Sequence, residues 1–223
     1  MIRTLIFDWD GTLHDTTRLY GCAFRKAYDW LVAQGAAPAR HYADADVTRY
    51  LGMNAKDMWN TFMPLLPQEM KTRASDIIGR EMISRIDAGE AILYPGAEET
   101  LTRLKEMGFE MTILSNCKRP YLRAHRSAFG LDRWFTGYYC CEDFGFVPKE
   151  EIFPRFRDRH PESYVMIGDR ASDLKVASVH GLPSVGCAYG FGSPEELGSA
   201  TCVANDVTEL PELIEKLLQE NRE

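Results

Sequence analysis

TLIFDWDGTLHDT, residues 4–16, begins with a short apolar run and ends in acidic residues grouped around a glycine. Continuous apolarity over residues 4–9 predicts a strand that is buried on both faces, as in a parallel sheet. Asp8 and Asp10 are two positions apart, so an extended backbone would place both on one side and turn Trp9 away. Gly11 and Thr12 follow, where a tight turn can aim backbone N–H groups at an anion.

Later segments repeat the alternation of strand and helix. Short apolar runs predict further strands, the last of them weaker than the rest, at 110–114, 138–141, 164–167, 184–185 and 202–203. Helical patterns lie between or after them, at 98–107, 121–129, 171–180 and 210–218. A glycine, the usual helix stop signal, follows each of the first three helices. This order predicts an α/β fold with a doubly wound parallel sheet.

One region breaks the alternation. Residues 15–91 contain no convincing strand, and their patterns predict helices at 19–34, 47–51, 55–62 and 69–86. Pro95 and Gly96 then mark the return to the α/β pattern. We therefore predict a catalytic core of residues 1–14 and 92–223 with a helical cap domain at 15–91. The alternative is a single domain whose extra helices cover one face of the sheet.

Composition excludes several classes of function. The 223 residues are 45% hydrophobic and 26% charged, with a net charge of −7, which argues against broad nucleic-acid binding. No apolar run approaches the length of a membrane span, and the N-terminal run is too short for a signal peptide. The six cysteines form no C-x-x-C pair, so we expect reduced thiols in a cytoplasmic protein.

Polar residues stand where several predicted strands end. They are Asp8 with Asp10, Ser115 with Asn116, Glu142 with Asp143, and Asp169. In open α/β sheets, ligands bind beyond the carboxyl ends of the strands. Carboxylates that meet there repel one another unless a cation or a shared proton offsets the repulsion. Oxygen ligands alone suit a hard ion such as Mg²⁺.

Together these segments resemble the haloacid dehalogenase superfamily in its phosphatase form. LIFDWDGTLHDT resembles the first signature of that family, and ILSN, ending in Ser115 and Asn116, resembles the second. Lys149 in VPKEEIF matches the third, and IGDRASD, with Asp169 and Asp173, matches the fourth. Four signatures in the expected order are far more specific than any one of them. The helical insert resembles the cap of the family.

The resemblance implies a role for each matched residue. Asp8 would attack phosphorus and form an aspartyl-phosphate, and Asp10 would act as the general acid and base. Mg²⁺ would be held by Asp8, the backbone carbonyl of Asp10 and Asp169, with Asp173 supporting the bound water. The phosphoryl oxygens would be bound by Ser115, Lys149 and backbone N–H groups near Gly11, Thr12 and Asn116.

Taken singly, these residues have ordinary interpretations. Ser115 with Asn116 could cap the following helix, Lys149 could be a solvated surface lysine, and Asp173 could be a first-turn acid. No role is assigned to His14, Lys118 or Arg170, although a structural ion pair is the favoured interpretation of Arg170. Because all four signatures occur together, we favour the roles implied by the resemblance over these interpretations.

The cap is expected to choose the substrate. YLGMNAKDMW places Gly52 and Asn54 between two helical stretches, and we interpret them, with Lys56, as a candidate specificity segment. A plain helix–helix turn is the competing interpretation. A cap that closes over the core would exclude water and suit a small phosphorylated metabolite, not a phosphoprotein or nucleic acid.

Other functions on the same fold stay open. The dehalogenases of the family lack an aspartate two residues after the nucleophile, so Asp10 argues against that chemistry. A phosphomutase or pyrophosphatase keeps both aspartates and stays an alternative, as does a non-catalytic phosphate-binding module. The cap and the Gly190–Gly192 segment resemble phosphoglycolate phosphatases, but a shared fold does not set the substrate. We expect a monomer or a weak homodimer.

Overall fold

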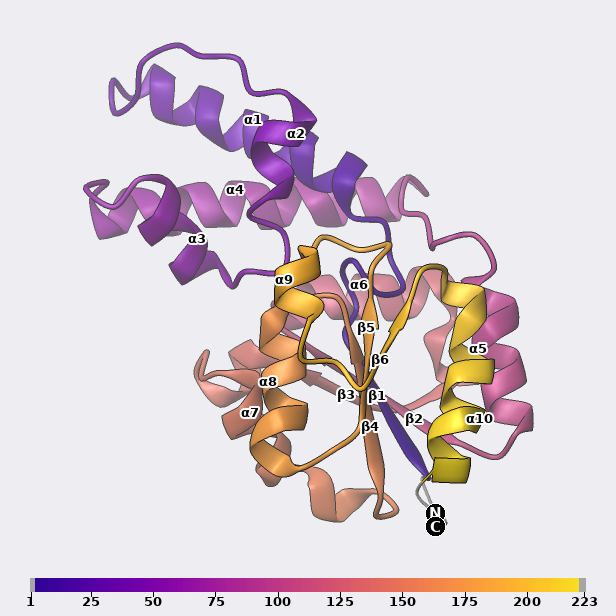
Figure 1. Ribbon diagram of the computed structural model, residues 1–223. Helices are drawn as coiled ribbons and strands as arrows, with labels where there is room; N and C mark the ends of the chain where they lie inside the picture. The colour runs from indigo at the N-terminus through magenta and orange to yellow at the C-terminus, as the bar shows by residue number, and fades with distance from the viewer. Residues whose placement is uncertain (1–2, 221–223) are drawn as a thin grey trace.

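A six-stranded sheet forms the centre of the protein, whose computed structural model describes residues 3–220 (Figure 1). The strands are β1 (Thr4–Phe7), β2 (Glu110–Ser115), β3 (Phe135–Cys140), β4 (Tyr164–Gly168), β5 (Ser184–Cys187) and β6 (Cys202–Ala204). All neighbouring strands pair in parallel, in the order β3-β2-β1-β4-β5-β6. The predicted α/β fold with a doubly wound parallel sheet is confirmed.

Helices cover both faces of this sheet. Successive side chains of a strand point to opposite faces, so Leu5 and Phe7 join one hydrophobic cluster and Ile6 joins the other. The first cluster includes residues of α5 (Ala97–Glu106), α6 (Arg119–Phe129) and α10 (Leu210–Glu220). The second includes residues of α7 (Lys149–Ile152) and α8 (Ala171–His180), on the other side of the sheet in Figure 1. β1, with apolar side chains at Leu5, Ile6 and Phe7, is therefore buried on both faces.

Several short helices complete the connections. They are α9 (Pro194–Leu197) and the 3-10 helices η1 (Leu131–Arg133), η2 (Cys141–Phe144), η3 (Phe153–Arg155), η4 (Arg157–Arg159) and η5 (Val207–Glu209). Two of them, η2 and α9, follow the carboxyl ends of β3 and β5, so they help to shape the edge where polar residues gather.

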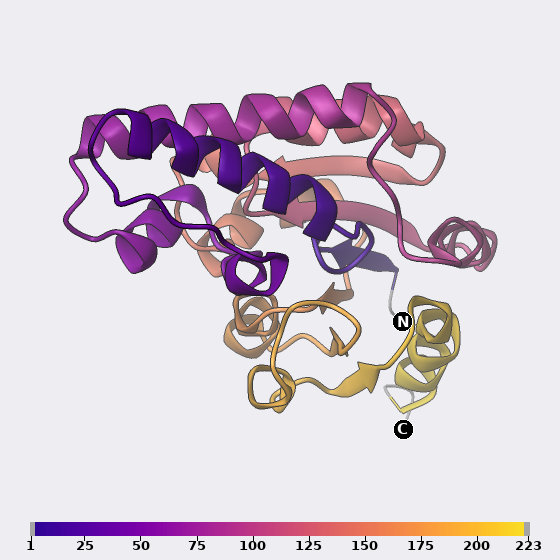
Figure 2. The same ribbon diagram turned by 90° about the horizontal axis from the view of Figure 1, so that it is seen from above.

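Four further helices form a helical lobe beside the sheet edge. They are α1 (Thr17–Ala33), α2 (Asp44–Thr48), α3 (Ala55–Phe62) and α4 (Gln68–Asp87). The long helices α1 and α4 lie side by side (Figure 2). Between the helices, the ring of Phe24 packs against Tyr42 at 5.6 Å and Phe62 at 5.0 Å, measured between ring centroids. This aromatic cluster packs the helices of the lobe together and is continuous with the hydrophobic cluster on one face of the sheet.

The two connections between lobe and sheet are hydrogen-bonded to each other. The N–H of Asp15 donates to the carbonyl of Ile92 at 3.1 Å, and the N–H of Tyr94 donates to the carbonyl of Leu13 at 3.0 Å. The chain thus leaves and re-enters the sheet layer at one place. The division into a core at 1–14 and 92–223 and a cap at 15–91 stays a prediction.

Several predicted boundaries differ from the structure, and three of them have a clear local basis. β1 ends at Phe7 instead of residue 9, because the N–H groups of Leu13 and His14 turn back to the carbonyl of Trp9. β3 begins at Phe135 instead of 138, because Gly137 pairs with β2 although it interrupts the apolar pattern. The helix expected at 47–51 is Asp44–Thr48.

The earlier start of α2 has a local cause. The Asp46 carboxylate accepts a hydrogen bond from the N–H of Ala43 at 2.9 Å, which satisfies one free donor at the helix start. Acidic residues in a first turn also favour a helix start, by interacting with the helix dipole. The helix therefore begins three residues before the apolar pattern does.

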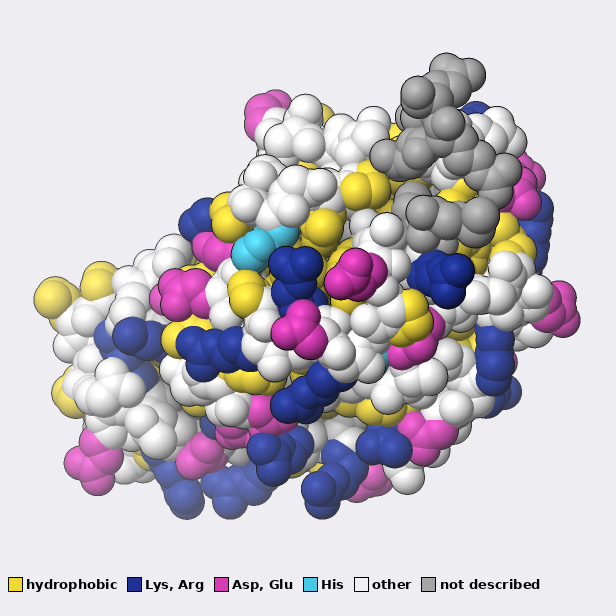
Figure 3. All heavy atoms as spheres, turned by 90° about the horizontal axis from the view of Figure 1, so that it is seen from below, with side chains coloured by type: hydrophobic (Ala, Val, Ile, Leu, Met, Phe, Trp, Pro, Cys, Tyr) yellow, Lys and Arg dark blue, Asp and Glu magenta, His cyan; other side chains and the backbone are white. Residues whose placement is uncertain are grey.

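The surface carries charges of both signs. Lysine and arginine side chains lie among aspartates and glutamates on the face seen from below (Figure 3). Exposed pairs such as Arg133 with Glu98, at 2.8 Å, each contribute at most about 1 kcal/mol. Within residues 3–220, no helix combines the length and apolarity that crossing a membrane would need.

Candidate active site

Three carboxylates and one lysine meet at the carboxyl edge of the sheet. Asp8 directly follows β1, Asp169 directly follows β4, Asp173 lies in the first turn of α8, and Lys149 begins α7. Each of these side chains is almost completely buried. Ligand oxygens of the three aspartates lie within 4.8 Å of one another. Three segments far apart in the sequence, around residues 8, 149 and 169–173, therefore build one charged cluster.

Lys149 pairs with two of the three carboxylates. Its Nζ lies 2.8 Å from Oδ1 of Asp8 and 2.7 Å from Oδ1 of Asp173. Burial opposes the charged form of Lys149, but the carboxylates of Asp173 and Asp8 outweigh it and raise the pKa of the lysine. One ammonium group thus faces three carboxylates, which leaves an excess of negative charge in the cluster.

Burial, together with this excess of negative charge, raises the pKa of two aspartates. Burial, with a smaller contribution from the Asp173 carboxylate, raises the pKa of Asp8 to about 7, although Lys149 opposes the shift. Burial and the charge of Asp8 also raise the pKa of Asp169 well above its usual range. In the absence of a cation, the site therefore favours protonated carboxyl groups, and a divalent cation would relieve the repulsion.

Asp169 is held in place from both sides. The Thr12 hydroxyl donates to Oδ1 at 3.1 Å, and the Phe191 N–H donates to Oδ2 at 2.8 Å. A Cβ at Gly11, whose φ is +87°, would overlap Oδ2 of Asp169, and one at Gly190 would overlap its side chain and the Gly11 carbonyl. Both glycines are therefore required for the close approach of the two loops to this carboxylate.

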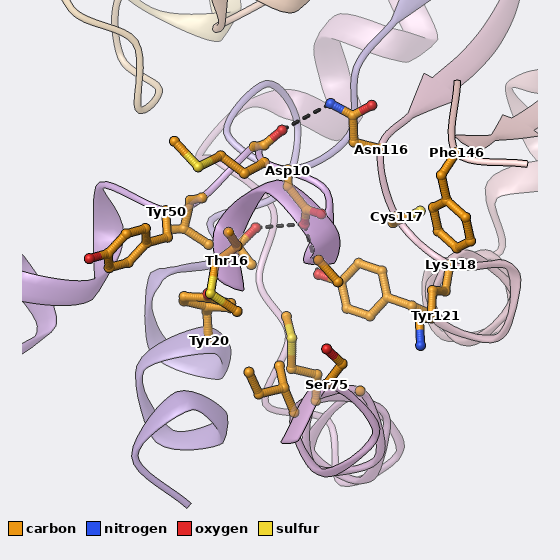
Figure 4. A pocket seen from close by; sticks show the side chains of 18 residues that line it. Asp10, Thr16, Tyr20, Tyr50, Ser75, Asn116, Cys117, Lys118, Tyr121 and Phe146 are labelled. Carbon is orange, nitrogen blue, oxygen red and sulfur yellow. Dashed lines mark hydrogen bonds between the residues drawn. The ribbon is translucent and has the colours of Figure 1, made fainter. Parts of the chain in front are cut away.

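Asp10 lies outside the carboxylate cluster and belongs to a separate polar group. Its Oδ1 accepts hydrogen bonds from the hydroxyls of Thr16 at 2.6 Å and Tyr121 at 2.7 Å (Figure 4). His14 Nδ1 lies 3.0 Å from the same oxygen. Burial alone would raise the pKa of Asp10, but hydrogen bonds and charge from His14, with the Thr16 hydroxyl, lower it. The carboxylate is thus oriented by groups from two separate segments.

Aromatic rings back this polar group. Trp9 stacks on His14 at 5.9 Å between ring centroids, and His125 contacts His14 edge-on at 4.3 Å. Burial, together with the neighbouring His14, lowers the pKa of His125 to about 3, so this ring is neutral. His14 therefore lies between a hydrogen-bonded carboxylate and an aromatic wall, and its orientation is fixed.

The predicted phosphate-binding residues lie at the same edge. Ser115 ends β2 and accepts a hydrogen bond from the Cys117 N–H at 3.3 Å. The N–H of Gly11 donates to the carbonyl of His14 at 3.0 Å, and that of Thr12 lies 3.4 Å from the carbonyl of Trp9. Their role towards phosphate stays a prediction.

Asn116 and Arg170 connect the sheet edge to the helical lobe. Asn116 Nδ2 donates to the carbonyl of Gly52 at 2.9 Å, and Nη1 of Arg170 donates to the carbonyl of Leu51. Arg170 also forms the ion pair that the sequence favoured, with its Nε 2.9 Å from Oε2 of Glu196. The main chain of residues 51–52 is thus hydrogen-bonded to the sheet edge at two points.

The residues of the predicted specificity segment are not all in one place. Gly52 lines a cavity between the lobe and the strand ends, which also contains Asp10 (Figure 4). Asn54 instead caps α3 by accepting a hydrogen bond from the Asp57 N–H at 3.0 Å. Lys56 lines a neighbouring depression, shared with Lys118. Of the three residues, Gly52 alone is among those that line the cavity of Asp10.

Two further acidic residues follow β3 at this edge but do not join the carboxylate cluster. Glu142 and Asp143 fall in the 3-10 helix η2, where Glu142 accepts a hydrogen bond from the Arg119 N–H at 2.9 Å. Asp143 accepts one from Arg119 Nε at 2.6 Å. The structure therefore separates this pair from the carboxylates of Asp8 and Asp169.

Sequence reasoning did not find the hydroxyls that bind Asp10. Thr16 lies within the quoted first segment, six residues after Asp10, but its side chain was given no role. Tyr121 comes from α6, 111 residues further along the chain, and follows a helical apolar pattern that is typical of core residues. No local signal distinguishes it from a packing residue.

Comparisons with known proteins show which family the sequence matches. The sequence model of the haloacid dehalogenase-like hydrolases matches residues 2–181. A phosphoglycolate phosphatase of Agrobacterium fabrum is 26% identical over 222 residues, which cover 96% of this chain and 93% of that protein. Another, from Pectobacterium atrosepticum, is 25% identical and covers 100% and 96% of the two chains.

Solved structures share the fold. A crystal structure of a predicted phosphatase from Clostridium acetobutylicum superimposes with a TM-score of 0.83 at 25% identity, and covers 97% of this chain and 99% of that chain. CbbY of Rhodobacter sphaeroides, solved in complex with phosphate, gives a TM-score of 0.75 at 22% identity and covers 94% and 96% of the two chains.

Proposed function

Because the chain belongs to the haloacid dehalogenase-like hydrolases and is an enzyme of phosphatase type, we propose that it cleaves a small phosphomonoester through an aspartyl-phosphate on Asp8. The observation that carries this proposal is the buried cluster in which Lys149 Nζ lies 2.8 Å from Asp8, with Asp169 and Asp173 beside them. A nucleophilic carboxylate needs positive charge around it before an anionic phosphoryl group can approach.

Two displacements at phosphorus account for the reaction. Asp8 attacks phosphorus, the bond to the leaving oxygen breaks, and Asp10 gives its proton to that oxygen. Asp10 then accepts a proton from a water molecule, whose oxygen attacks the phosphorus of the aspartyl-phosphate. The bond between phosphorus and Asp8 breaks, which releases inorganic phosphate and restores the carboxylate.

The carboxylate cluster fits a magnesium ion. Three buried carboxylates with one lysine form an oxygen-only donor set with an excess of negative charge. We assign Asp8, the backbone carbonyl of Asp10 and Asp169 as ligands, with Asp173 in support. When bound, Mg²⁺ supplies charge neutralisation for the carboxylates and the phosphoryl oxygens, which otherwise repel one another.

Phosphoryl oxygens have donors at the same edge. We assign this binding to Lys149, the Ser115 hydroxyl and backbone N–H groups around Gly11, Thr12 and Asn116. The helical lobe would cover the substrate and exclude water, with Gly52 in the wall of the cavity and Asn54 and Lys56 at neighbouring depressions. A small phosphorylated metabolite fits such a covered site, and we expect a cytoplasmic monomer or weak homodimer.

Phosphate release from small phosphomonoesters tests the function. The purified protein, with Mg²⁺, is expected to release inorganic phosphate from p-nitrophenyl phosphate and from members of a metabolite panel that includes 2-phosphoglycolate. EDTA should stop the release, and added Mg²⁺ should restore it. A retained, rearranged phosphosugar would indicate a mutase, hydrolysis of pyrophosphate alone would indicate a pyrophosphatase, and binding without turnover would indicate a non-catalytic module.

Tyr121→Phe is expected to change the pH profile of the reaction. A hydrogen bond to a charged group contributes about 1.5–3 kcal/mol, and about 1.4 kcal/mol corresponds to one pKa unit. Loss of the Tyr121 hydroxyl should therefore raise the pKa of Asp10, so the limb of the kcat profile that depends on Asp10 should move up by roughly one pH unit.

Tyr28→Phe is the matched control. Its hydroxyl is part-buried and donates to the carbonyl of Pro38 at 2.8 Å within the helical lobe, so its removal should leave the pH profile unchanged. Identical profiles for the Tyr121→Phe and Tyr28→Phe proteins would show that Tyr121 does not act on Asp10.

Metal binding is expected to alter the pH dependence of stability. Between about pH 4 and pH 7, folded metal-free Asp8 holds a proton that the unfolded chain has released. The free energy of unfolding contributed by Asp8 should therefore fall as pH rises through this window. Mg²⁺ binds the deprotonated form, so it should raise Tm more at pH 8 than at pH 5.

Thermal unfolding with Mg²⁺ or with EDTA measures this effect. A ligand at 100 times its Kd stabilises the folded protein by about 2.7 kcal/mol. Asp169→Asn should reduce the increase in Tm, whereas Asp143→Asn, outside the cluster, should not. An equal Tm with Mg²⁺ and with EDTA at pH 8 would contradict the assigned metal site.

A further inference from the structure

The cavity that contains Asp10 occupies the position of the leaving group. This argument rests on the proposed function, in which Asp10 gives its proton to the leaving oxygen. Asp10, Thr16 and Tyr121 lie together in the wall of the cavity, and its other lining residues come from the helical lobe and from positions 116–118 and 146 of the sheet layer (Figure 4). The group esterified to phosphate must therefore extend from Asp10 into this space, and the side chains of the cavity select it.

Most of the cavity wall is apolar. It is formed mainly by Tyr20, Tyr50, Met58, Ile78, Met82 and Phe146. The space open to the centre of a water-sized sphere is about 140 Å³. A single water needs roughly 10–15 Å³ by the same measure, so the cavity can take a group much larger than water. Methionine side chains adapt to irregular apolar surfaces and make favourable contacts with aromatic rings.

The polar groups of the wall are largely engaged within the protein. The Thr16 and Tyr121 hydroxyls donate to Asp10, and the Asn116 amide donates to the Gly52 carbonyl. Ser75 donates to the carbonyl of Lys71 at 2.8 Å and accepts from Trp59 at 2.7 Å. These groups can bind a substrate only by giving up existing hydrogen bonds.

The cavity also lacks an available positive charge among the residues that line it. Lys118 is the one cationic residue there, and its Nζ lies 3.5 Å from Oδ1 of Asp76. Its side chain is 36% exposed, and it extends away from Asp10 in Figure 4. A carboxylate on the leaving group would therefore lose its hydration without gaining a close cation, which is costly.

We propose that the preferred substrate is a phosphomonoester whose leaving group is uncharged and apolar, of the size of a benzyl group, and not a carboxylate such as 2-phosphoglycolate. The phosphoryl group binds at the carboxylate cluster, and the ring lies between Tyr20, Met82 and Phe146. An apolar leaving group is favoured because its surface is removed from water in the cavity. A leaving group with a carboxylate is disfavoured because its charge would be unpaired there.

A pair of substrates with similar leaving groups tests this proposal. Benzyl phosphate and 2-phosphoglycolate are both esters of primary alcohols, so their intrinsic reactivity is similar and the cavity decides between them. With Mg²⁺, kcat/KM for benzyl phosphate is expected to exceed that for 2-phosphoglycolate at least tenfold, or about 1.4 kcal/mol. Equal values, or a preference for 2-phosphoglycolate, would overturn the proposal while the proposed function stands.

Activity on neither ester, with none on p-nitrophenyl phosphate, would instead refute the proposed function itself.

A variant then tests whether the cavity binds the leaving group. Met53 lines it and is 37% exposed, so Met53→Lys should fold and supply a cation. It should shift the ratio of kcat/KM towards 2-phosphoglycolate by about two- to fivefold, as for a partly exposed ion pair.

Leu65→Lys is the matched control, since Leu65 is 96% exposed in the same lobe and does not line this cavity. It adds the same charge and should leave the ratio unchanged. If the Met53→Lys and Leu65→Lys proteins gave the same ratio as the wild-type enzyme, the cavity would not bind the leaving group and the proposal would be wrong.

Discussion

Asp8→Asn is expected to abolish phosphate release. The amide keeps the size of the carboxylate but cannot act as the nucleophile, so no aspartyl-phosphate can form. Loss of a covalent nucleophile lowers kcat by on the order of 10⁴–10⁶-fold in well-studied enzymes. Steady-state hydrolysis of p-nitrophenyl phosphate, with mass spectrometry of the acid-quenched protein for the phosphoryl adduct, measures both consequences.

The folded protein should tolerate this change. Burial raises the pKa of Asp8, so its charge opposes folding above neutral pH, and a neutral amide should not lower the free energy of unfolding. Asp143→Asn is the control, because that aspartate also follows a strand but contacts Arg119 instead of the cluster. Wild-type hydrolysis by the Asp8→Asn protein would eliminate Asp8 as the nucleophile.

Lys149→Met is expected to lower both stability and activity. The side chain is completely buried, and its Nζ is within 2.8 Å of two carboxylates, which the substitution would leave without their cation. Breaking a buried ion pair by removing one partner costs about 3–5 kcal/mol. Loss of a donor to the phosphoryl oxygens should lower kcat by about 10²–10³-fold, as for other oxyanion donors.

Chemical denaturation and steady-state kinetics measure these two effects. Lys175→Met removes an exposed lysine that pairs with Glu150 at 2.6 Å, and should cost at most about 1 kcal/mol. Mg²⁺ should recover part of the stability of the Lys149→Met protein, because a bound cation also offsets the repulsion among the aspartates. An unchanged kcat would mean that Lys149 is a structural residue alone.

The sequence predicts the frame of the site because strand ends are local features. Asp8 and Asp169 each follow an apolar run and precede a glycine-containing or helical segment, and parallel pairing of β1 with β4 places them together. The same rule failed for Glu142 and Asp143. A 3-10 helix begins at once after β3, and the arginine at the start of α6 binds both side chains.

Residues that act on Asp10 and on the leaving group were harder to find, because they are defined by tertiary contacts. Tyr121 reaches Asp10 through the packing of α6 against the turn at Trp9, and neither segment predicts that approach. Ile78 and Met82 follow a helical spacing that is equally typical of a buried core face. These two residues line a cavity only because the lobe lies beside the sheet edge.

The attachment of residues 51 and 52 to the sheet edge uses their main-chain carbonyls as acceptors. Main-chain acceptors persist when side chains are exchanged, so the partly exposed Met53 can diversify without losing the anchorage of the segment. Position 52 is the exception, since its φ of +82° and the nearby Arg170 side chain demand glycine. Descendants of this enzyme, natural or engineered, can therefore acquire new substrates here through side-chain changes that leave the register of the segment intact.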